Sequence, residues 1–296
     1  MTAPLNRRAG HRPDWLRIRV PGNLDQLPVS RLMNDLALNT VCQEARCPNI
    51  FECWSAGTAT FMVLGEICTR RCTFCAVGKG APLAADPDEP RRVAEAVARM
   101  GVKHAVITMV NRDDMPDGGA EQVARTVAAV RERSGAAVEV LISDLEGDRD
   151  ALRLVVASRP EVLAHNIETV PRLYPAVRPV AKYLRSLDIL RWAAEDNMLT
   201  KSSLMLGLGE TEDEILAVAR DLRDAGVEIF TMGQYLAPTG NHHPVRRYYT
   251  PEEFAELGER ARALGFRHVE SAPLVRSSYM AHRAIESPSD AARDVR

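Results

Sequence analysis

The distribution of cysteines constrains this chain more than any other feature of its sequence. All six cysteines of the 296 residues fall within one short window. They form two triplets, C-x4-C-x5-C (Cys42, Cys47, Cys53) and C-x3-C-x2-C (Cys68, Cys72, Cys75). Each triplet is one thiolate short of the four ligands that close a structural zinc site or saturate an iron–sulfur cluster. An open ligand position is where a substrate or cofactor binds, so the pattern predicts a catalytic centre.

Three structural roles compete for these cysteines. A disulfide framework is typical of small secreted chains, whereas this chain is long and shows no secretory signal. Structural zinc needs a fourth Cys or His ligand nearby, but no histidine occurs between His11 and His104. Buried free cysteines give no reason for clustering. We therefore favour iron–sulfur ligation, with structural zinc as the next alternative.

The second triplet has an aromatic residue, Phe74, directly before its last cysteine. This arrangement resembles the signature of the radical S-adenosylmethionine (SAM) enzymes. The resemblance implies that Cys68, Cys72 and Cys75 bind a [4Fe–4S] cluster whose fourth iron is chelated by SAM. It also implies that these cysteines are catalytic, because electron transfer from the cluster cleaves SAM to a 5′-deoxyadenosyl radical. The protein's share of such chemistry is ligation, orientation and exclusion of side reactions.

Further sequence blocks narrow the resemblance to the lipoyl synthases. Their amino-terminal motif is similar to CQEARCPNIFECW, and matching blocks include HNIETV, GQYLAPT and RSSYMA, as far as Ala281. One departure is Phe51, where the family motif has glycine, but the cysteine spacing is intact. The resemblance implies that the first triplet binds a second, auxiliary [4Fe–4S] cluster. It also implies that Ser278, the serine before the tyrosine of RSSY, completes the ligands and takes part in catalysis.

The chain between residues 58 and 266 alternates strand and helix signals at roughly 30-residue spacing. Helical periodicity appears at Val93, Val97 and Met100, and Thr211 with Glu214 predicts a capped helix start. Six such units predict an incomplete (β/α)6 TIM-type barrel with its site at the carboxyl ends of the strands. The resemblance implies the same fold. The strands are expected near 58–64, 104–110, 136–142, 161–166, 200–206 and 228–234.

Two segments flank the predicted barrel. Residues 1–57 are expected to form an extension that carries the auxiliary motif, with an extended arm over 1–30, a short helix over 31–40 and the first triplet on a loop. Residues 267–296 are expected to form a carboxyl-terminal segment. For Ser278 to reach the first triplet, this segment must fold back across the barrel mouth. Its polar end, ESPSDAARDVR, is predicted to be disordered.

Polar residues recur where the predicted strands end, and these residues are candidates for holding SAM. A capping or turn role explains each one equally well, but their repetition at one edge of the barrel favours a site. Weaker candidates are the pairs Gly118-Gly119 and His242-His243, for which turn and loop roles are at least as good. The cofactor-binding candidates are Phe74, Asn111, Asp113, Asn166, Glu168 and Gln234.

Bulk composition excludes some classes of partner. The formal net charge is −2, from 38 basic and 40 acidic residues, which gives no electrostatic reason to expect nucleic acid or a membrane. No apolar run is long enough for a transmembrane helix. We expect a cytoplasmic protein, because a reducing compartment suits open thiolate sites.

The resemblance implies a lipoyl synthase activity. Two sulfur atoms would replace hydrogens at C6 and C8 of an octanoyl chain on a lipoyl-carrier domain, of 2-oxoacid dehydrogenase E2 or glycine cleavage H protein. The auxiliary cluster would be the sulfur donor, with a flavodoxin or ferredoxin-type reductant and an iron–sulfur carrier protein as partners. One alternative is another two-cluster radical enzyme, such as an RNA methylthiotransferase, but no added basic domain is evident. A non-enzymatic electron carrier or zinc-binding module, with closed four-ligand sites, is the other.

Overall fold

The structure is a computed structural model that describes residues 12–17, 27–55, 58–279 and 281. An eight-stranded sheet lies at its centre, in the order β1-β2-β5-β6-β7-β8-β9-β10. All neighbouring strands are parallel except β1 and β2, which are antiparallel. The strands are β1 (Asn39–Thr40), β2 (Thr60–Val63), β5 (His104–Met109), β6 (Ala137–Leu141), β7 (Val162–Ala164), β8 (Thr200–Leu206), β9 (Ile229–Gln234) and β10 (His268–Ser271).

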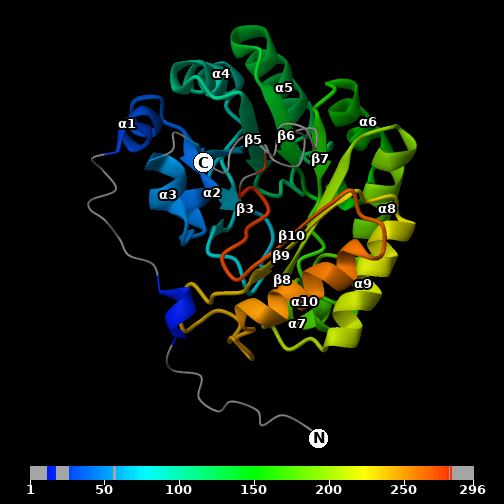
Figure 1. The fold of residues 1–296 in the computed structure, drawn as a ribbon. Coiled ribbons are helices and arrows are strands. Elements are labelled where there is room, and N and C mark those ends of the chain that lie inside the picture. Colours follow the sequence, from blue (N-terminus) through cyan, green and yellow to red (C-terminus); the bar gives the residue numbers. More distant parts are fainter. Residues whose placement is uncertain (1–11, 18–26, 56–57, 280, 282–296) are drawn as a thin grey trace, which may run out of the picture.

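Helices surround the curved sheet on its outer side (Figure 1). A separate pair of short parallel strands, β3 (Ile67–Cys68) and β4 (Gly78–Lys79), brackets the second cysteine triplet. Single-turn 3-10 helices occur at Asp14–Leu16, Leu145–Gly147 and Pro171–Leu173. The α-helices are α1 (Pro28–Asp35), α2 (Val41–Glu44), α3 (Ile50–Ser55), α4 (Glu89–Met100), α5 (Ala120–Ser134), α6 (Arg149–Ala157), α7 (Tyr174–Val177), α8 (Tyr183–Glu195), α9 (Glu212–Asp224) and α10 (Pro251–Arg262).

These elements confirm the predicted incomplete barrel, and their local causes are visible in the sequence. All six expected strands are present, and they are almost wholly buried because helices cover their outer face. Val93 and Val97 turn into the core from α4. Thr211 and Glu214 form the expected capping box at the start of α9, so each satisfies one backbone N–H that the helix leaves free.

The barrel is open, since β1 and β10 lie at opposite edges of the sheet. Residues 272–279, here called the C-terminal strap, cross towards β2. The backbone N–H of Gln234 donates to the carbonyl oxygen of Pro273 at 3.1 Å, and Thr60 Oγ1 donates to Ser278 Oγ at 2.9 Å. A Cβ atom on Gly233 would lie 2.0 Å from the carbonyl oxygen of Val275, so only glycine permits this approach. The strap therefore folds back over the barrel mouth, as predicted.

The amino-terminal segment differs from the prediction in three ways. Its helix spans Pro28–Asp35, because Pro28 suits a first helical turn, and a short strand rather than helix follows at Asn39–Thr40. The first triplet is not all loop: Cys42 lies in α2 and Cys53 in α3. The side chain of Thr40 starts α2 by accepting a hydrogen bond from the Gln43 N–H.

Other expectations fall partly or wholly outside the described residues. Most of the expected arm lies in 1–11 and 18–26, and the polar tail lies in 286–296. Within the described part of the arm, Leu16 is buried against the domain. Across the ranges that the structure describes, none of the helices combines the length and apolarity needed to cross a membrane.

Candidate active site

A cavity of about 880 Å³ opens at the carboxyl ends of the barrel strands. Its walls come from β2, β5, β6, β8 and β9, from the two cysteine-bearing segments and from the C-terminal strap. Except for Cys53 and Asp113, every residue predicted for the site lines it. They are Cys42, Cys47, Cys68, Cys72, Phe74, Cys75, Asn111, Asn166, Glu168, Gln234 and Ser278.

The second triplet lies on the loop that leaves β3, here called the triplet loop (residues 68–76). The backbone N–H of Arg70 points at Cys68 Sγ, 3.4 Å away. Burial raises the pKa of Cys75 to about 12, and the neighbouring Cys72 and Cys68 thiols add to the rise. The three sulfur atoms therefore lie close enough to interact electrostatically inside one cavity.

Arg70 holds the triplet loop in place through ion pairs with two aspartates. Its guanidinium, 3% exposed, contacts Asp113 Oδ2 at 2.8 Å and Asp144 Oδ1 at 2.6 Å. Burial alone would raise the pKa of Asp144, but the hydrogen bond and charge of Arg70 lower it to about 2. Asp113 also accepts a hydrogen bond from Thr69 Oγ1 at 3.1 Å. Asp113 is thus engaged with the loop and does not line the cavity.

The first triplet gathers on the other side of the cavity. Burial raises the pKa of Cys53 to about 12, with further contributions from the nearby Cys42 and Cys47 thiols. Thr60 lies within hydrogen-bonding reach of Cys42 and donates to Ser278 Oγ at 2.9 Å. The fold therefore brings Ser278 beside this triplet, although more than two hundred residues separate it from Cys53 in the sequence.

The donor set suits iron–sulfur clusters. None of the six cysteines is in a disulfide. Among the described residues, no three Cys, His, Asp or Glu side chains converge tightly enough for a single metal ion. In a cubane cluster each thiolate binds a different iron, so the sulfur ligands stand farther apart than those around one ion. The two cysteine triplets beside this cavity therefore offer donor sets that fit such clusters.

Buried polar groups without partners line the wall next to the triplet loop. Asn166 Nδ2 donates to Glu168 Oε1 at 3.1 Å, but Asn166 Oδ1 has no partner within the described part of the chain. Arg178 Nη1 donates to the carbonyl oxygen of Asn166 at 3.0 Å, whereas its Nε is likewise unpartnered there. Native buried groups of this kind are usually satisfied, so this wall fits a polar ligand such as SAM.

The side-chain amide of Gln234 is hydrogen-bonded within the protein, which its position at a strand end did not predict. Its amide nitrogen donates to the carbonyl oxygens of Leu206 and Arg247, each at 3.0 Å, and its amide oxygen accepts from the N–H of Tyr249 at 2.9 Å. Both ends of the amide are therefore used within the protein.

The weaker sequence candidates are explained by local structure. Gly118 and Gly119 have positive φ angles and start α5, and a Cβ on Gly119 would lie 2.4 Å from Leu64 Cδ1. This pair serves as a helix-start turn and does not line the cavity. His242 and His243 each contact backbone oxygens, and together they form no metal pair.

Sequence reasoning missed several residues of the cavity wall. Burial raises the pKa of the Cys72 and Cys47 thiols, and the positive charges of Arg178 and Arg276, respectively, oppose that rise. Arg70 holds the triplet loop through its ion pairs with Asp113 and Asp144. Arginine is common on protein surfaces, and nothing in the local pattern marked these three as residues of the cavity wall.

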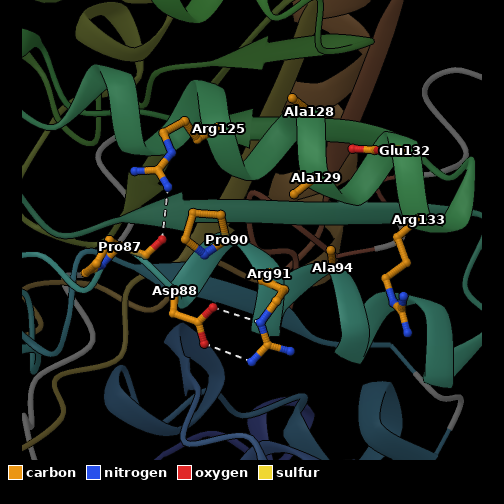
Figure 2. Close-up of a pocket in the computed structure, with 10 residues that line it drawn as sticks. All are labelled: Pro87, Asp88, Pro90, Arg91, Ala94, Arg125, Ala128, Ala129, Glu132 and Arg133. Carbon is orange, nitrogen blue, oxygen red and sulfur yellow. Dashed lines mark hydrogen bonds and ion pairs between the residues drawn. The ribbon is translucent and has the colours of Figure 1, made fainter.

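A second hollow lies outside the barrel, between α4 and α5 (Figure 2). Asp88 pairs with Arg91 at 2.8 Å across its edge, and Arg125 donates to the Pro87 carbonyl oxygen at 3.0 Å. Alanines form its floor, and none of the predicted site residues lines it. The chemistry-bearing groups are in the barrel-mouth cavity.

Comparisons with known proteins agree with this geometry. The family model described as the Radical SAM superfamily matches residues 62–222. A protein of Rubrobacter xylanophilus named lipoyl synthase is 58% identical over 93% of this chain and 87% of its own length. Another of that name, from Koribacter versatilis, is 54% identical over 95% of this chain and 93% of its own length.

Solved structures share the fold at low sequence identity. Streptococcus suis SuiB, bound to S-adenosylmethionine, matches with a TM-score of 0.55 at 11% identity, over 72% of this chain and 51% of that chain. HydG, a maturase of the [FeFe]-hydrogenase, matches with a TM-score of 0.53 at 14% identity, over 71% of this chain and 55% of that chain.

Proposed function

Because this chain belongs to the lipoyl synthases of the radical SAM superfamily, we propose that it inserts two sulfur atoms into a protein-bound octanoyl group. The substrate is an octanoyl chain amide-linked to a lysine of a lipoyl-carrier domain, and the sulfur atoms enter at C6 and C8. One observation carries the proposal: the second triplet, two cysteines of the first triplet and Ser278 line a single cavity, and Cys53 lies near the other two cysteines of its triplet. A radical generator and a sulfur donor can then act on the same chain.

Cys68, Cys72 and Cys75 are the proposed ligands of the radical-generating cluster. With SAM, that cluster supplies a 5′-deoxyadenosyl radical, which removes hydrogen from carbon that acid–base chemistry does not activate. The protein holds the three thiols in a cavity whose wall includes the strap and residues 236–238, which limits side reactions. The unpartnered polar atoms of Asn166 and Arg178 provide the proposed contacts to SAM.

The auxiliary cluster is the proposed sulfur donor and therefore a substrate. Its ligands are Cys42, Cys47, Cys53 and Ser278. Thiolates are soft ligands that suit iron–sulfur clusters, whereas a serine oxygen is hard and far more basic. Thr60 Oγ1 already donates to Ser278 Oγ at 2.9 Å, so a hydrogen-bond donor stands ready as the oxygen leaves iron. Ser278 would thus be suited to release its iron when the substrate carbon radical bonds to a cluster sulfide and cluster iron takes up the electron.

An apolar wall fits the hydrocarbon chain of the substrate. Val41, Ile50, Phe51 and Met62 line the cavity near the first triplet, and Met109 lines it from β5. Phe51, a departure from the family motif, adds an aromatic side chain here. The remaining partners are a flavodoxin or ferredoxin-type reductant and an iron–sulfur carrier protein that rebuilds the auxiliary cluster.

The direct test is anaerobic incubation with an octanoylated carrier domain, SAM and a reductant, followed by mass spectrometry of the carrier. We expect two sulfur atoms to replace two hydrogens, with two molecules of 5′-deoxyadenosine released per lipoyl group. A carrier that remains octanoylated while SAM is cleaved, with both clusters present, would contradict the proposal.

A further inference from the structure

A loop from the far edge of the barrel reaches the triplet loop. We call residues 236–249, which follow β9, the β9 loop. The backbone N–H of His243 donates to the carbonyl oxygen of Thr73 at 2.9 Å, and His242 Nε2 lies 3.2 Å from the carbonyl oxygen of Cys75. Since β2 and β9 are five positions apart in the strand order, no sheet hydrogen bonds join these two regions. The histidine pair therefore links them directly.

The partners of His242 fix the orientation of its ring. A carbonyl oxygen only accepts hydrogen bonds, so Nε2 must carry the proton that it shares with Cys75. In the neutral ring Nδ1 then accepts from Thr239 Oγ1, 2.8 Å away. Thr239 Oγ1 also accepts from the N–H of Asn241 at 3.2 Å, which holds the hydroxyl in place. Because both ring nitrogens are engaged, His242 acts here as a donor and not as a metal ligand.

Both sides of this link are held by the rest of the protein. On the β9 loop, His243 Nε2 donates to the Leu208 carbonyl oxygen at 2.9 Å, and Tyr235 Oη donates to the His243 carbonyl oxygen at 2.8 Å. On the triplet loop, the N–H of Thr73 donates to the carbonyl oxygen of Val177, at the end of α7, at 2.9 Å. The triplet loop is thus hydrogen-bonded to α7 on one side and to the β9 loop on the other.

We propose that His242 is a positioning residue for the radical-generating cluster. Its Nε2–H holds the Cys75 peptide and so sets the direction from which Cys75 Sγ meets iron. The inference rests on the proposed role of Cys68, Cys72 and Cys75 as cluster ligands. Groups that hold a metal ligand in place typically change metal affinity or activity by about 10- to 100-fold when they are removed. Hydrogen bonding and exposure also set the reduction potential of such clusters.

Three substitutions of His242 distinguish the effect of losing its hydrogen-bond donor from the effect of changing the size of the side chain. His242→Gln places an amide N–H where Nε2 stands, so it retains a donor for Cys75. His242→Asn reaches only as far as Nδ1, so it retains the contact with Thr239 alone. His242→Phe keeps the ring but loses both hydrogen bonds. His268→Phe is the matched control, since His268 contacts Glu270 on β10, outside the cavity wall.

The primary readout is the rate at which a chelator removes iron from the reconstituted protein, which contains both clusters. The second is the electron paramagnetic resonance spectrum of the reduced protein with and without SAM. We expect the Phe and Asn variants to lose the SAM-responsive cluster about 10-fold faster or more, with an altered spectrum. The Gln and control variants should stay within about 3-fold of the parent, below the 10- to 100-fold range expected when the supporting group is lost.

Two results would overturn the inference: a Phe variant that keeps the parent rate and spectrum, or a Gln variant as impaired as Phe. If the Phe variant does not fold, Thr239→Val provides the second test, because it removes only the hydroxyl that orients the ring. A parent-like rate and spectrum in Thr239→Val would then count against the proposal. Neither readout requires sulfur insertion, so failure of the proposed function and failure of this inference are distinguishable.

Discussion

The two cysteine triplets share one cavity but are held by different parts of the chain. The second triplet is supported by charged side chains of the barrel itself, through the contacts of Arg70 with Asp113 and Asp144. The first triplet is supported by neutral hydrogen bonds to the C-terminal strap. In these, Asn49 donates to the Leu274 carbonyl oxygen at 2.7 Å and Thr60 to Ser278 at 2.9 Å.

Under the proposed function, this difference corresponds to one cluster that is kept and one that is consumed and rebuilt. Breaking a buried ion pair costs about 3–5 kcal/mol, whereas a neutral hydrogen bond contributes about 0.5–1.5 kcal/mol. The radical-generating cluster must survive many turnovers, and its loop has the stronger support. The cluster proposed to be consumed lies beneath a segment that detaches at lower cost. The predictions below test this division, from the largest expected effect to the smallest.

Removing one cysteine from each triplet should give two different losses. In Cys72→Ala, both 5′-deoxyadenosine release and sulfur insertion should disappear, because the generating cluster loses a ligand. In Cys47→Ala, only insertion should disappear, and unproductive SAM cleavage should persist. Liquid chromatography with mass spectrometry measures both products. If Cys47→Ala folds, retains the cluster of the second triplet and still fails to cleave SAM, the two triplets do not have separate roles.

Replacing Ser278 should affect the first triplet alone. Ser278→Cys substitutes a soft ligand for a hard one, so the auxiliary cluster should be retained at least as well as in the parent. SAM cleavage should continue while sulfur transfer slows or stops, since a thiolate leaves iron less readily. Iron content and lipoyl product per chain are the measurements. A variant that forms lipoyl product at the parent rate would show that the lability of this ligand is irrelevant.

Arg70→Met should destabilise the fold as well as the site. The substitution leaves Asp113 and Asp144 without their shared partner, and we expect a loss of about 3–5 kcal/mol in the free energy of unfolding. Arg91→Met is the matched control, because its partner Asp88 is exposed and solvent screening makes such surface pairs weak. Denaturant titration followed by circular dichroism measures both. Equal losses in the two variants would mean that the Arg70 network does not support the barrel mouth.

Acid should weaken the same network. Arg70 lowers the pKa of the Asp144 carboxyl from its ordinary value of 3.8 to about 2. The stabilisation is therefore fully present above the ordinary value and is lost as pH falls through about 2. The shift corresponds to about 2 kcal/mol. Unfolding free energies measured between roughly pH 5 and 2 should fall more steeply in the parent than in Asp144→Asn. Parallel curves would show that Asp144 does not contribute.

Local signals in the sequence predicted much of this molecule. The capping box at Thr211 is formed by neighbouring residues, so the start of α9 was readable directly. Both cysteine triplets were also recognisable from the sequence, because the members of each triplet lie close together along the chain. The short helices α2 and α3 were missed, because four and six residues carry too little periodicity to detect.

Long-range pairing limited the prediction of the site. Asp113 and Gln234 stand at strand ends, as a site residue would, yet their polar atoms are used by Arg70 and by backbone groups of distant segments. Buried Arg178 gave no local signal either. Such roles depend on which loops meet at the barrel mouth, and that is set by the fold and not by neighbours in the sequence.

The most direct test of the two-triplet account is the origin of the inserted sulfur. The protein is reconstituted with isotopically heavy sulfide, freed of excess sulfide, and incubated with octanoylated carrier domain, SAM and reductant in ordinary buffer. The account predicts that both inserted sulfur atoms are heavy, that at most one lipoyl group forms per chain, and that Cys47→Ala forms none. Light sulfur in the product, or repeated turnover without a new source of clusters, would contradict it.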